Sequence, residues 1–245
     1  MDAISIAAAS GMRARMESLE LLANNLANTE TGGYKADREF YSLYTSADAS
    51  ADPQTGALAT LPVIEHHWTD PAQGDLHQTG NPLDFAIDGD GLFSVQTPRG
   101  LRYTRNGNFR LSPAGVLTTS GGDAVQAKGG GTIRLQPGIA VEVSSDGSVR
   151  QGAQLSGQLD LASFDPQAMN KEGHNYFALV AGGSVKPAAG GAVLQGKLEG
   201  SNAGGPESAV RLVSIMRQFE MLQKAMSIGN ELNRRAIEEV ARVQQ

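Results

Sequence analysis

A long stretch near the end of the chain, residues 206–243, repeats apolar side chains at intervals of three and four residues. This spacing is typical of one face of an α-helix that packs against other helices. We call this face the heptad seam; its positions are Leu212, Ile215, Phe219, Leu222, Met226, Gly229, Asn233, Ala236, Val240 and Val243. Pro206 suits the first turn of such a helix. The pairs Glu220–Lys224, Glu231–Arg235 and Glu238–Arg242 place an acid four residues before a base, which favours a solvated outer face.

The length of this predicted helix limits what it can pack against. At about 1.5 Å per residue, roughly 38 residues give a rod of about 57 Å, whereas a compact domain of about 100 residues has a radius of gyration near 13 Å. The beginning of the chain, residues 2–28, carries a second helical apolar repeat. Its members are Ile4, Ala8, Met12, Met16, Leu19, Ala23 and Leu26. We therefore expect the two ends of the chain to pair as a helical arm.

Between Leu83 and Leu198 the pattern changes to short strand-like runs separated by glycine-containing turns. Most of the 30 glycines lie in this part of the chain. The predicted strands are residues 83–87, 92–96, 101–105, 109–111, 116–118, 140–143, 148–150, 155–164, 176–180 and 193–198. The sequence predicts an α+β fold, in which paired N- and C-terminal helices flank a mainly antiparallel β domain of sandwich or barrel type.

Four segments follow from these patterns. Residues 1–33 form the N-terminal helix, which we expect to end near Asn28 because weak helix formers and a Gly-Gly pair follow it. Residues 34–82 are a linker and extended segment, with a loop at 46–60 and a strand at 63–68. Residues 83–200 are the β domain, and residues 201–245 are the C-terminal helix.

Composition excludes several classes of function. The net charge of −6 and the absence of a basic cluster disfavour a nucleic-acid partner. The chain has no cysteine, which excludes disulfides and thiol chemistry. No apolar run approaches the roughly 20 residues that span a bilayer. Asp2 stands where a secretory signal peptide carries positive charge, so we expect neither membrane insertion nor a cleaved signal peptide.

No residue pattern predicts a catalytic, cofactor or metal site. The Asp88-Gly89-Asp90-Gly91 turn resembles the start of a calcium loop, but Leu92 and Arg99 stand where further ligands are needed. The histidines in one segment lack zinc-site spacing: His66, His67 and His77. A Gly-x-Ser-x-Gly nucleophile elbow is absent. We predict that the protein is not an enzyme.

The terminal helices carry the clearest functional signal. Five methionines lie in them, and methionine supplies a flexible apolar surface: Met12, Met16, Met216, Met221 and Met226. An ordinary helix pair would explain the seam alone, but apolar residues beside it widen the stripe, and an apolar patch left in water usually marks an interface. The predicted assembly residues are Met12, Met16, Leu19, Leu26, Leu212, Ile215, Phe219, Leu222, Met226, Gly229 and Val240.

Several motifs in order resemble the bacterial flagellar axial proteins, the rod and hook family. The first comprises Asn24, Asn25, Leu26, Ala27 and Asn28, followed by Gly33, Tyr34 and Lys35. The others are residues 83–87, 91–93, 103–107, 198–202 and 217–221. The resemblance implies a structural subunit of the basal-body rod in the periplasm, exported by the flagellar type III apparatus and assembled with copies of itself and other rod subunits.

Within that family, residues 198–202 and 217–221 resemble the proximal rod subunit most, with the distal rod subunit as the alternative. A head-to-tail contact that does not close produces a filament, so a coiled-coil assembly of terminal helices would suit a drive shaft. A different class also stays open: a β module that binds a ligand, with the two helices as a dimerisation stalk.

Overall fold

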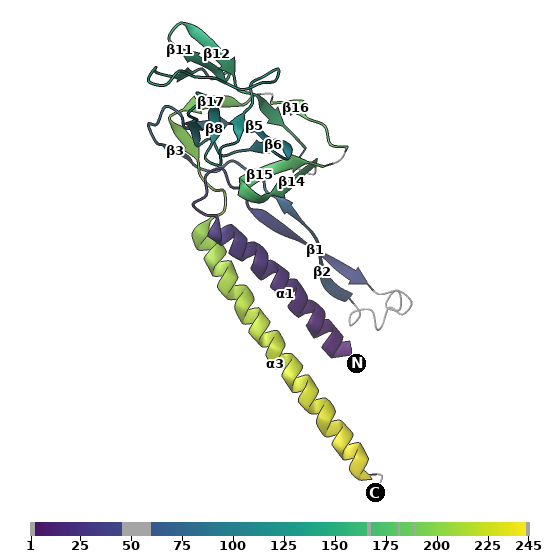
Figure 1. Cartoon of the computed structure of the whole chain (residues 1–245). Coiled ribbons are helices and arrows are strands. Elements are labelled where there is room, and N and C mark those ends of the chain that lie inside the picture. Colours follow the sequence, from purple (N-terminus) through teal and green to yellow (C-terminus); the bar gives the residue numbers. More distant parts are fainter. Residues whose placement is uncertain (1–2, 46–59, 166–167, 181, 189, 244–245) are drawn as a thin grey trace. The chain divides into compact units, whose positions relative to one another are not determined.

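The computed structural model describes residues 3–45, 60–165, 168–180, 182–188 and 190–243 (Figure 1). Within these residues the fold is α+β, with an N-terminal helix, a C-terminal helix and mainly antiparallel β-sheets. The chain divides into two compact units. Unit 1 comprises Met1–Ala27, Asp37–Trp68 and Gly205–Gln245, and unit 2 comprises Asn28–Ala36 and Thr69–Gly204.

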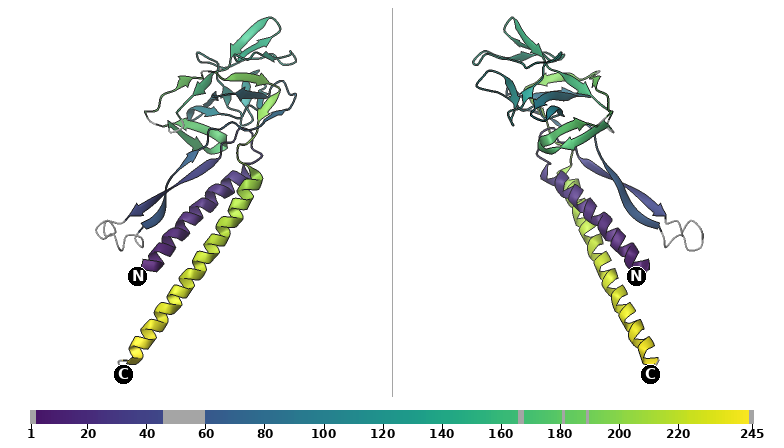
Figure 2. Two further views of the ribbon diagram at one scale, coloured as in Figure 1. Left: turned by 180° about the vertical axis from the view of Figure 1, so that it is seen from behind. Right: turned by 45° about the vertical axis from the view of Figure 1, so that its right-hand side comes forward.

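Unit 1 contains the two long helices. They are α1 (Ala3–Ala27) and α3 (Gly205–Val243), and they lie side by side, as the sequence predicted (Figures 1 and 2). The two helices run antiparallel (Figure 1). Because α3 has 39 residues and α1 has 25, α3 is longer by about 21 Å at about 1.5 Å per residue. The last part of α3 extends past the beginning of α1 (Figure 2).

The segment predicted as a linker contains a two-stranded sheet, which corrects that expectation. Its strands are β1 (Asp37–Thr45) and β2 (Thr60–Thr69). The predicted strand at 63–68 lies within β2. Residues 37–45 belong to the segment predicted as linker, although their three aromatic residues also suit a strand. The predicted loop at 46–60 lies, apart from Thr60, outside the described residues.

The described part of unit 2 consists of short strands joined by tight turns and the 3-10 turn η3. The elements are β3 (Leu76–Gln78), β4 (Phe85–Asp88), β5 (Leu92–Thr97), β6 (Gly100–Thr104), β7 (Phe109–Leu111), β8 (Leu117–Thr119), β9 (Ala124–Val125), β10 (Glu142–Val143), β11 (Ser148–Gln151), β12 (Gln154–Gln158), β13 (Leu161–Ser163), β14 (Met169–Glu172), η3 (Gly173–Asn175), β15 (Tyr176–Leu179), β16 (Lys186–Pro187), β17 (Ala192–Gln195) and β18 (Lys197–Glu199).

The largest sheet of unit 2 has nine strands, seven of them in the order β14-β15-β6-β5-β9-β8-β7. The other two are β13, which pairs with β5, and β16, which pairs with β13. β10, β11 and β12 form a separate three-stranded sheet. Two further pairs connect distant parts of the sequence. β17 pairs with β4 so that Val193 faces Ile87, and β18 pairs with β3 so that Leu198 faces His77. These pairings bring residues 192–199 beside residues 76–88.

The main core of unit 2 is a buried apolar cluster around three phenylalanines. Phe93 packs edge-on against Phe109 with ring centroids 5.1 Å apart, and Phe85 lies 5.9 Å from Phe109. At Gly107 the backbone lies very close to this cluster. A Cβ at that position would lie 1.7 Å from the Phe85 carbonyl oxygen, so no side chain fits there. A second cluster contains Leu92, Tyr103, Ala162 and Phe177.

Candidate assembly surface and buried ion cluster

The heptad seam of α3 coincides with its buried side. Ile215 is 7% exposed, and the remaining seam positions from Leu212 to Gly229 are half-buried: Leu212, Phe219, Leu222, Met226 and Gly229. The side chains of Asn233, Ala236, Val240 and Val243 are outside those that the structure describes. The predicted register of the seam therefore agrees with burial in the first two-thirds of α3.

The stripe predicted on α1 is rotated away from the most buried side of that helix. The structure buries Ala14, Ser18, Leu22 and Asn25, whereas Met16 is 52% exposed and Ala23 is exposed. Met12, Leu19 and Leu26 are half-buried. Ala14 and Ser18 on the buried side are small, and small side chains let helices approach closely. A Cβ built on Gly11 would be 3.6 Å from Leu222 Cδ1, in ordinary van der Waals contact.

A second apolar stripe on α3 is exposed in this chain. Val210 is 71% exposed, and five other large apolar side chains of α3 are exposed by about half or more: Val213, Met216, Met221, Ile228 and Leu232. In the sequence these residues lie beside the seam positions. Apolar surface of this extent on a helix pair usually marks an interface.

The Asn24–Asn28 motif ties the end of α1 to the β1 strand within unit 1. The Asn25 amide nitrogen donates to the Asp37 carbonyl oxygen at 2.8 Å, and the Asp37 backbone nitrogen donates to the Asn25 side-chain oxygen at 3.0 Å. Asn28 accepts a hydrogen bond from the Thr31 hydroxyl at 3.0 Å. Asn24 and Ala27 are exposed. The sequence spacing did not predict the hydrogen bonds of Asn25 and Asn28.

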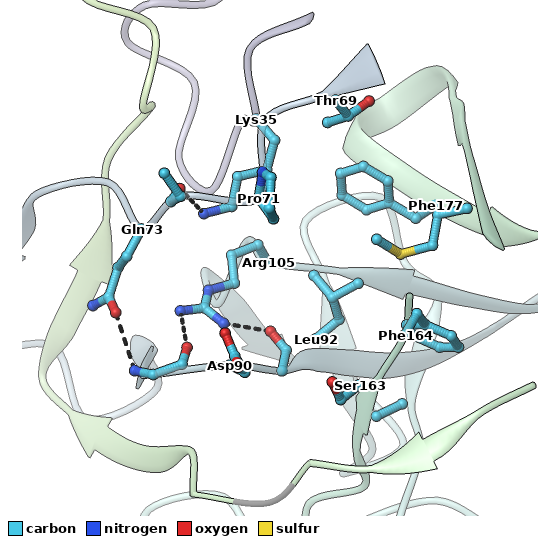
Figure 3. A pocket seen from close by; sticks show the side chains of 15 residues that line it. Lys35, Thr69, Pro71, Gln73, Asp90, Leu92, Arg105, Ser163, Phe164 and Phe177 are labelled. Atoms are coloured by element: carbon cyan, nitrogen blue, oxygen red, sulfur yellow. Dashed lines mark hydrogen bonds between the residues drawn. The ribbon is translucent and has the colours of Figure 1, made fainter. Parts of the chain in front are cut away.

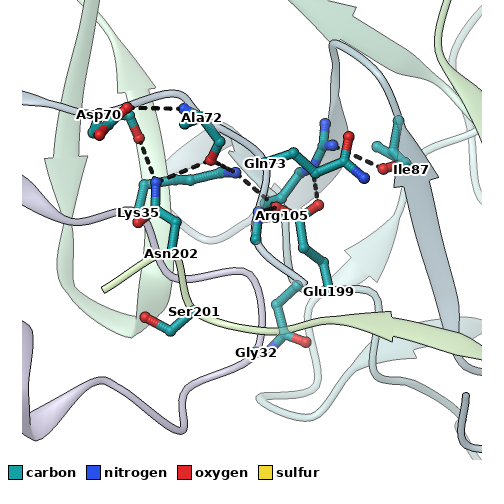
Figure 4. Close-up of polar contacts among 12 residues, drawn as sticks. Gly32, Lys35, Asp70, Ala72, Gln73, Ile87, Arg105, Glu199, Ser201 and Asn202 are labelled. Carbon is teal, nitrogen blue, oxygen red and sulfur yellow. Dashed lines mark hydrogen bonds and ion pairs between the residues drawn. The ribbon is translucent and has the colours of Figure 1, made fainter. Parts of the chain in front are cut away.

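Unit 2 contains an ion cluster that sequence reasoning missed (Figure 4). Glu199 is fully buried, and its carboxylate accepts from Lys35 Nζ at 2.7 Å and from Arg105 Nε at 2.5 Å. It also accepts from the Gly74 backbone nitrogen at 3.0 Å. Burial lowers the pKa of the Lys35 ammonium, and the bond to Glu199 opposes that shift.

Arg105 extends the cluster into the β4–β5 turn. Its terminal nitrogens donate to the carbonyl oxygens of Ile87 at 2.8 Å and Gly89 at 2.7 Å, and also to that of Gly91. Lys35 Nζ donates to the Ala72 carbonyl oxygen at 2.7 Å. Three of the motifs that carry the resemblance therefore meet here, one contributing Lys35, one Arg105 and one Glu199. Their separation along the chain hid this arrangement from pattern analysis.

Further contacts hold together the segments that surround the ion cluster. The Asn202 side chain accepts from the Ala36 nitrogen at 2.6 Å and donates to the carbonyl oxygens of Asp70 and Ala72, both at 2.9 Å (Figure 4). Gly33 has φ of +66°, and a Cβ there would lie 2.5 Å from the Arg105 carbonyl carbon. Only glycine fits this close approach. Lys171 Nζ lies 3.7 Å from the centre of the Tyr34 ring, a cation–π contact.

The turn that resembles the start of a calcium loop is exposed to solvent. Asp88 and Asp90 are exposed on the β4–β5 turn. Among the described residues, no group of three or more His, Cys, Asp or Glu side chains could hold a metal ion. No described helix is long and apolar enough to cross a membrane.

Known proteins match this chain along nearly its whole length. A family model described as the flagellar hook protein FlgE/F/G D1 domain matches residues 86–151, and one described as the flagellar basal body rod FlgEFG protein C-terminal matches residues 194–239. The flagellar basal-body rod protein FlgF of Caulobacter vibrioides is 33% identical over 231 residues, which cover 92% of each chain. FlgG of Bacillus subtilis is 30% identical, covering 91% of this chain and 93% of its own. FlgF of Salmonella typhimurium is 29% identical, covering 87% and 88%.

Proposed function

This chain belongs to the flagellar basal-body rod protein family and is a structural subunit of the rod, and we propose that it forms part of the proximal rod. The resemblance of residues 198–202 and 217–221 to proximal subunits supports this position. The family assembles with other rod subunits in the flagellar basal body. We further propose that the chain has no catalytic activity and that the flagellar type III apparatus exports it into the periplasm without cleaving a signal peptide.

The observation that carries the assembly mechanism is the uncovered apolar surface of α3. The pair formed by α1 and α3 leaves Val210, Met221 and Leu232 in water, and burying such side chains stabilises by roughly 1.5–3 kcal/mol each. Copies packed around a common axis would cover them. We propose that the seam residues Leu212, Ile215, Phe219, Leu222, Met226, Gly229 and Val240 contact neighbouring subunits, together with the partly exposed Met12, Met16, Leu19 and Leu26 of α1.

Deleting the gene tests this proposal. Cells should grow normally and lack flagella, and electron cryotomography should show a rod missing from its inner-membrane end. A rod that forms at that end and lacks only its outer part would place the subunit distally instead. The subunit recovered from basal bodies should retain residues 4–12, as measured by intact mass. A cleaved N-terminus would contradict the proposed export route.

Light scattering on the purified chain separates a rod subunit from a dimerisation stalk. A stalk predicts a closed dimer whose mass stops rising with concentration. A rod subunit predicts a monomer that forms open-ended assemblies once neighbours are supplied.

A further inference from the structure

A cavity of about 440 Å³ lies against the ion cluster of unit 2 (Figure 3). One wall is apolar and includes Leu92, Phe164, Met169 and Phe177. The opposite wall includes the side chains of Lys35 and Arg105. A volume of this size, with an apolar wall and a few converging polar groups, is typical of ligand sites.

The side chains of Lys35 and Arg105 have more N–H donors than the described acceptors around them use. A guanidinium has five N–H groups, and Arg105 uses one on Glu199, one on Gly91, one on Ile87 and one on Gly89. An ammonium has three, and Lys35 uses one on Ala72 and one on Glu199. Among the described residues, one N–H of each side chain is therefore left without an acceptor. The Lys35 and Arg105 side chains are only 6% and 4% exposed, so an unmet donor there is costly.

Three carboxylates lie near the two cations, so an added anion must bind through the unused N–H groups of Lys35 and Arg105 and not through net charge alone. Glu199 is the carboxylate bonded to both cations. Asp70 lies near Lys35, but its side chain accepts from the Ala72 nitrogen at 3.0 Å. Asp90 lines the cavity from an exposed position at its edge. A carboxylate bonded directly to Lys35 and Arg105 would accept their remaining N–H groups through charge-assisted hydrogen bonds.

We propose that this cavity binds a carboxylate carried on an apolar group. The carboxylate accepts the remaining N–H groups of Lys35 and Arg105, and the apolar group packs on Leu92, Phe164 and Phe177. Such a carboxylate is either an acidic side chain of a neighbouring rod subunit, which rests on the proposed function, or a small organic acid. Both present the same chemistry to the site.

Titration of the purified full-length chain with phenylacetate, followed by NMR, tests the proposal directly. Phenylacetamide has nearly the same shape without the charge, so phenylacetate should bind at least about tenfold more tightly, because charge-assisted hydrogen bonds are the stronger ones. Equal binding of the two probes, or binding of neither, would overturn the proposal. This measurement does not depend on rod assembly, so its failure would leave the proposed function untouched.

Variants locate the binding. Ser163→Trp places a large ring in the cavity and should abolish phenylacetate binding, whereas Ser120→Trp, at an exposed turn outside the cavity lining, should leave it unchanged. Asp90→Asn removes a negative charge at the edge and should strengthen binding a few-fold. Should Ser163→Trp fail to fold, Met169→Ala tests the apolar wall and should weaken binding. Unchanged binding in the cavity variants would overturn the assignment of the site.

Motility distinguishes the two sources of the carboxylate. If a neighbouring subunit supplies it, folded Ser163→Trp protein should fail to build rods in cells. If a small acid supplies it, rods should form, and native mass spectrometry of the wild-type chain purified from cells should detect the bound acid, which the variant lacks.

Discussion

Glu199 holds two cations in the interior of unit 2, so its charge is the most sensitive single feature of that unit. We expect Glu199→Gln to lower the free energy of unfolding by about 3–5 kcal/mol, because it leaves Lys35 and Arg105 buried without their anion. Calorimetry of the full chain would measure this as a drop in the unfolding temperature of unit 2. Glu142→Gln, the same change at an exposed position, should stay within about 0.5 kcal/mol. Equal effects of the two changes would mean that the ion cluster contributes no net stability.

The Tyr176 hydroxyl gives unit 2 a pH-dependent contact at alkaline pH. It donates to Asp123 Oδ2 at 2.8 Å and lies 3.0 Å from Thr119 Oγ1. Partial burial raises the pKa of Tyr176 to about 12 from its ordinary value of 10.0. The unfolded chain therefore loses this proton first, and the stabilisation present below pH 10 declines as pH rises towards 12.

Tyr176→Phe should remove this contribution. We expect it to cost about 1–2 kcal/mol at neutral pH through the lost hydrogen bonds. Between pH 10 and 12 the wild-type chain should lose more stability than the variant, so the two unfolding temperatures should converge. Thermal unfolding at a series of pH values would measure this, and parallel curves would show that the hydroxyl titrates normally.

At the scale of elements, the sequence pattern predicted many of the short strands and turns of unit 2. The strand at 109–111 forms as predicted, and the turn at Asp146-Gly147 joins β10 to β11, with Gly147 at φ of +80°. The predicted strand at 193–198 is split, because Gly196 adopts φ of +72° between β17 and β18. The strand at 155–164 is likewise divided into β12 and β13.

What sequence could not predict depends on distant partners. β3 and β14 are short and polar, and each exists through pairing with another strand, β18 and β15 respectively. The ion cluster joins Lys35 to Glu199, which are 164 residues apart. The predicted α1 stripe does not coincide with the buried side of that helix. Two faces of α1 can carry helical spacing, one with small residues packed against a partner and one with larger apolar residues left exposed. Periodicity alone does not show which of the two faces is buried.

The seam of α3 makes its own prediction at this scale. Leu222 is half-buried and faces Gly11 of α1. Leu222→Asp should weaken the pairing of α1 with α3, because it places a charge where apolar contact is needed, while unit 2 unfolds at an unchanged temperature. Cells should export the variant and fail to build rods. Gln223→Asp adds the same charge at the next, exposed position and should support normal motility. Rods built from Leu222→Asp would contradict the seam assignment.

For the whole molecule, the helical part of unit 1 is incomplete by itself. α3 outreaches α1, and large apolar side chains of α3 are exposed along it. Long helices depend on tertiary packing more than on intrinsic propensity. The free subunit therefore has helices that are formed but incompletely covered, and neighbouring subunits would supply the remaining contacts.

A substitution at Gly229 should affect the free chain and the assembled rod in opposite directions. In the described structure no atom lies within 4 Å of a Cβ built at Gly229, so leucine fits in the free chain. Gly229→Leu should make α3 more helical, since leucine is the better helix former by roughly 0.8 kcal/mol. We propose that the seam packs closely against helices of neighbouring subunits in the rod, where a large side chain at Gly229 would intrude. We therefore expect higher helicity by circular dichroism together with poorer rod assembly.

Ser227→Leu provides the matched control for this change. It also replaces a poorer helix former with leucine, but at an exposed position off the seam. This variant should gain helicity and still assemble, as judged by motility and by rods seen in isolated basal bodies. The opposition between the two variants comes from packing between subunits, because both act alike on the isolated helix. If Gly229→Leu assembled as well as Ser227→Leu, Gly229 would not be a packing position, and the seam register in the rod would differ by at least one residue from the register that burial gives in the free chain.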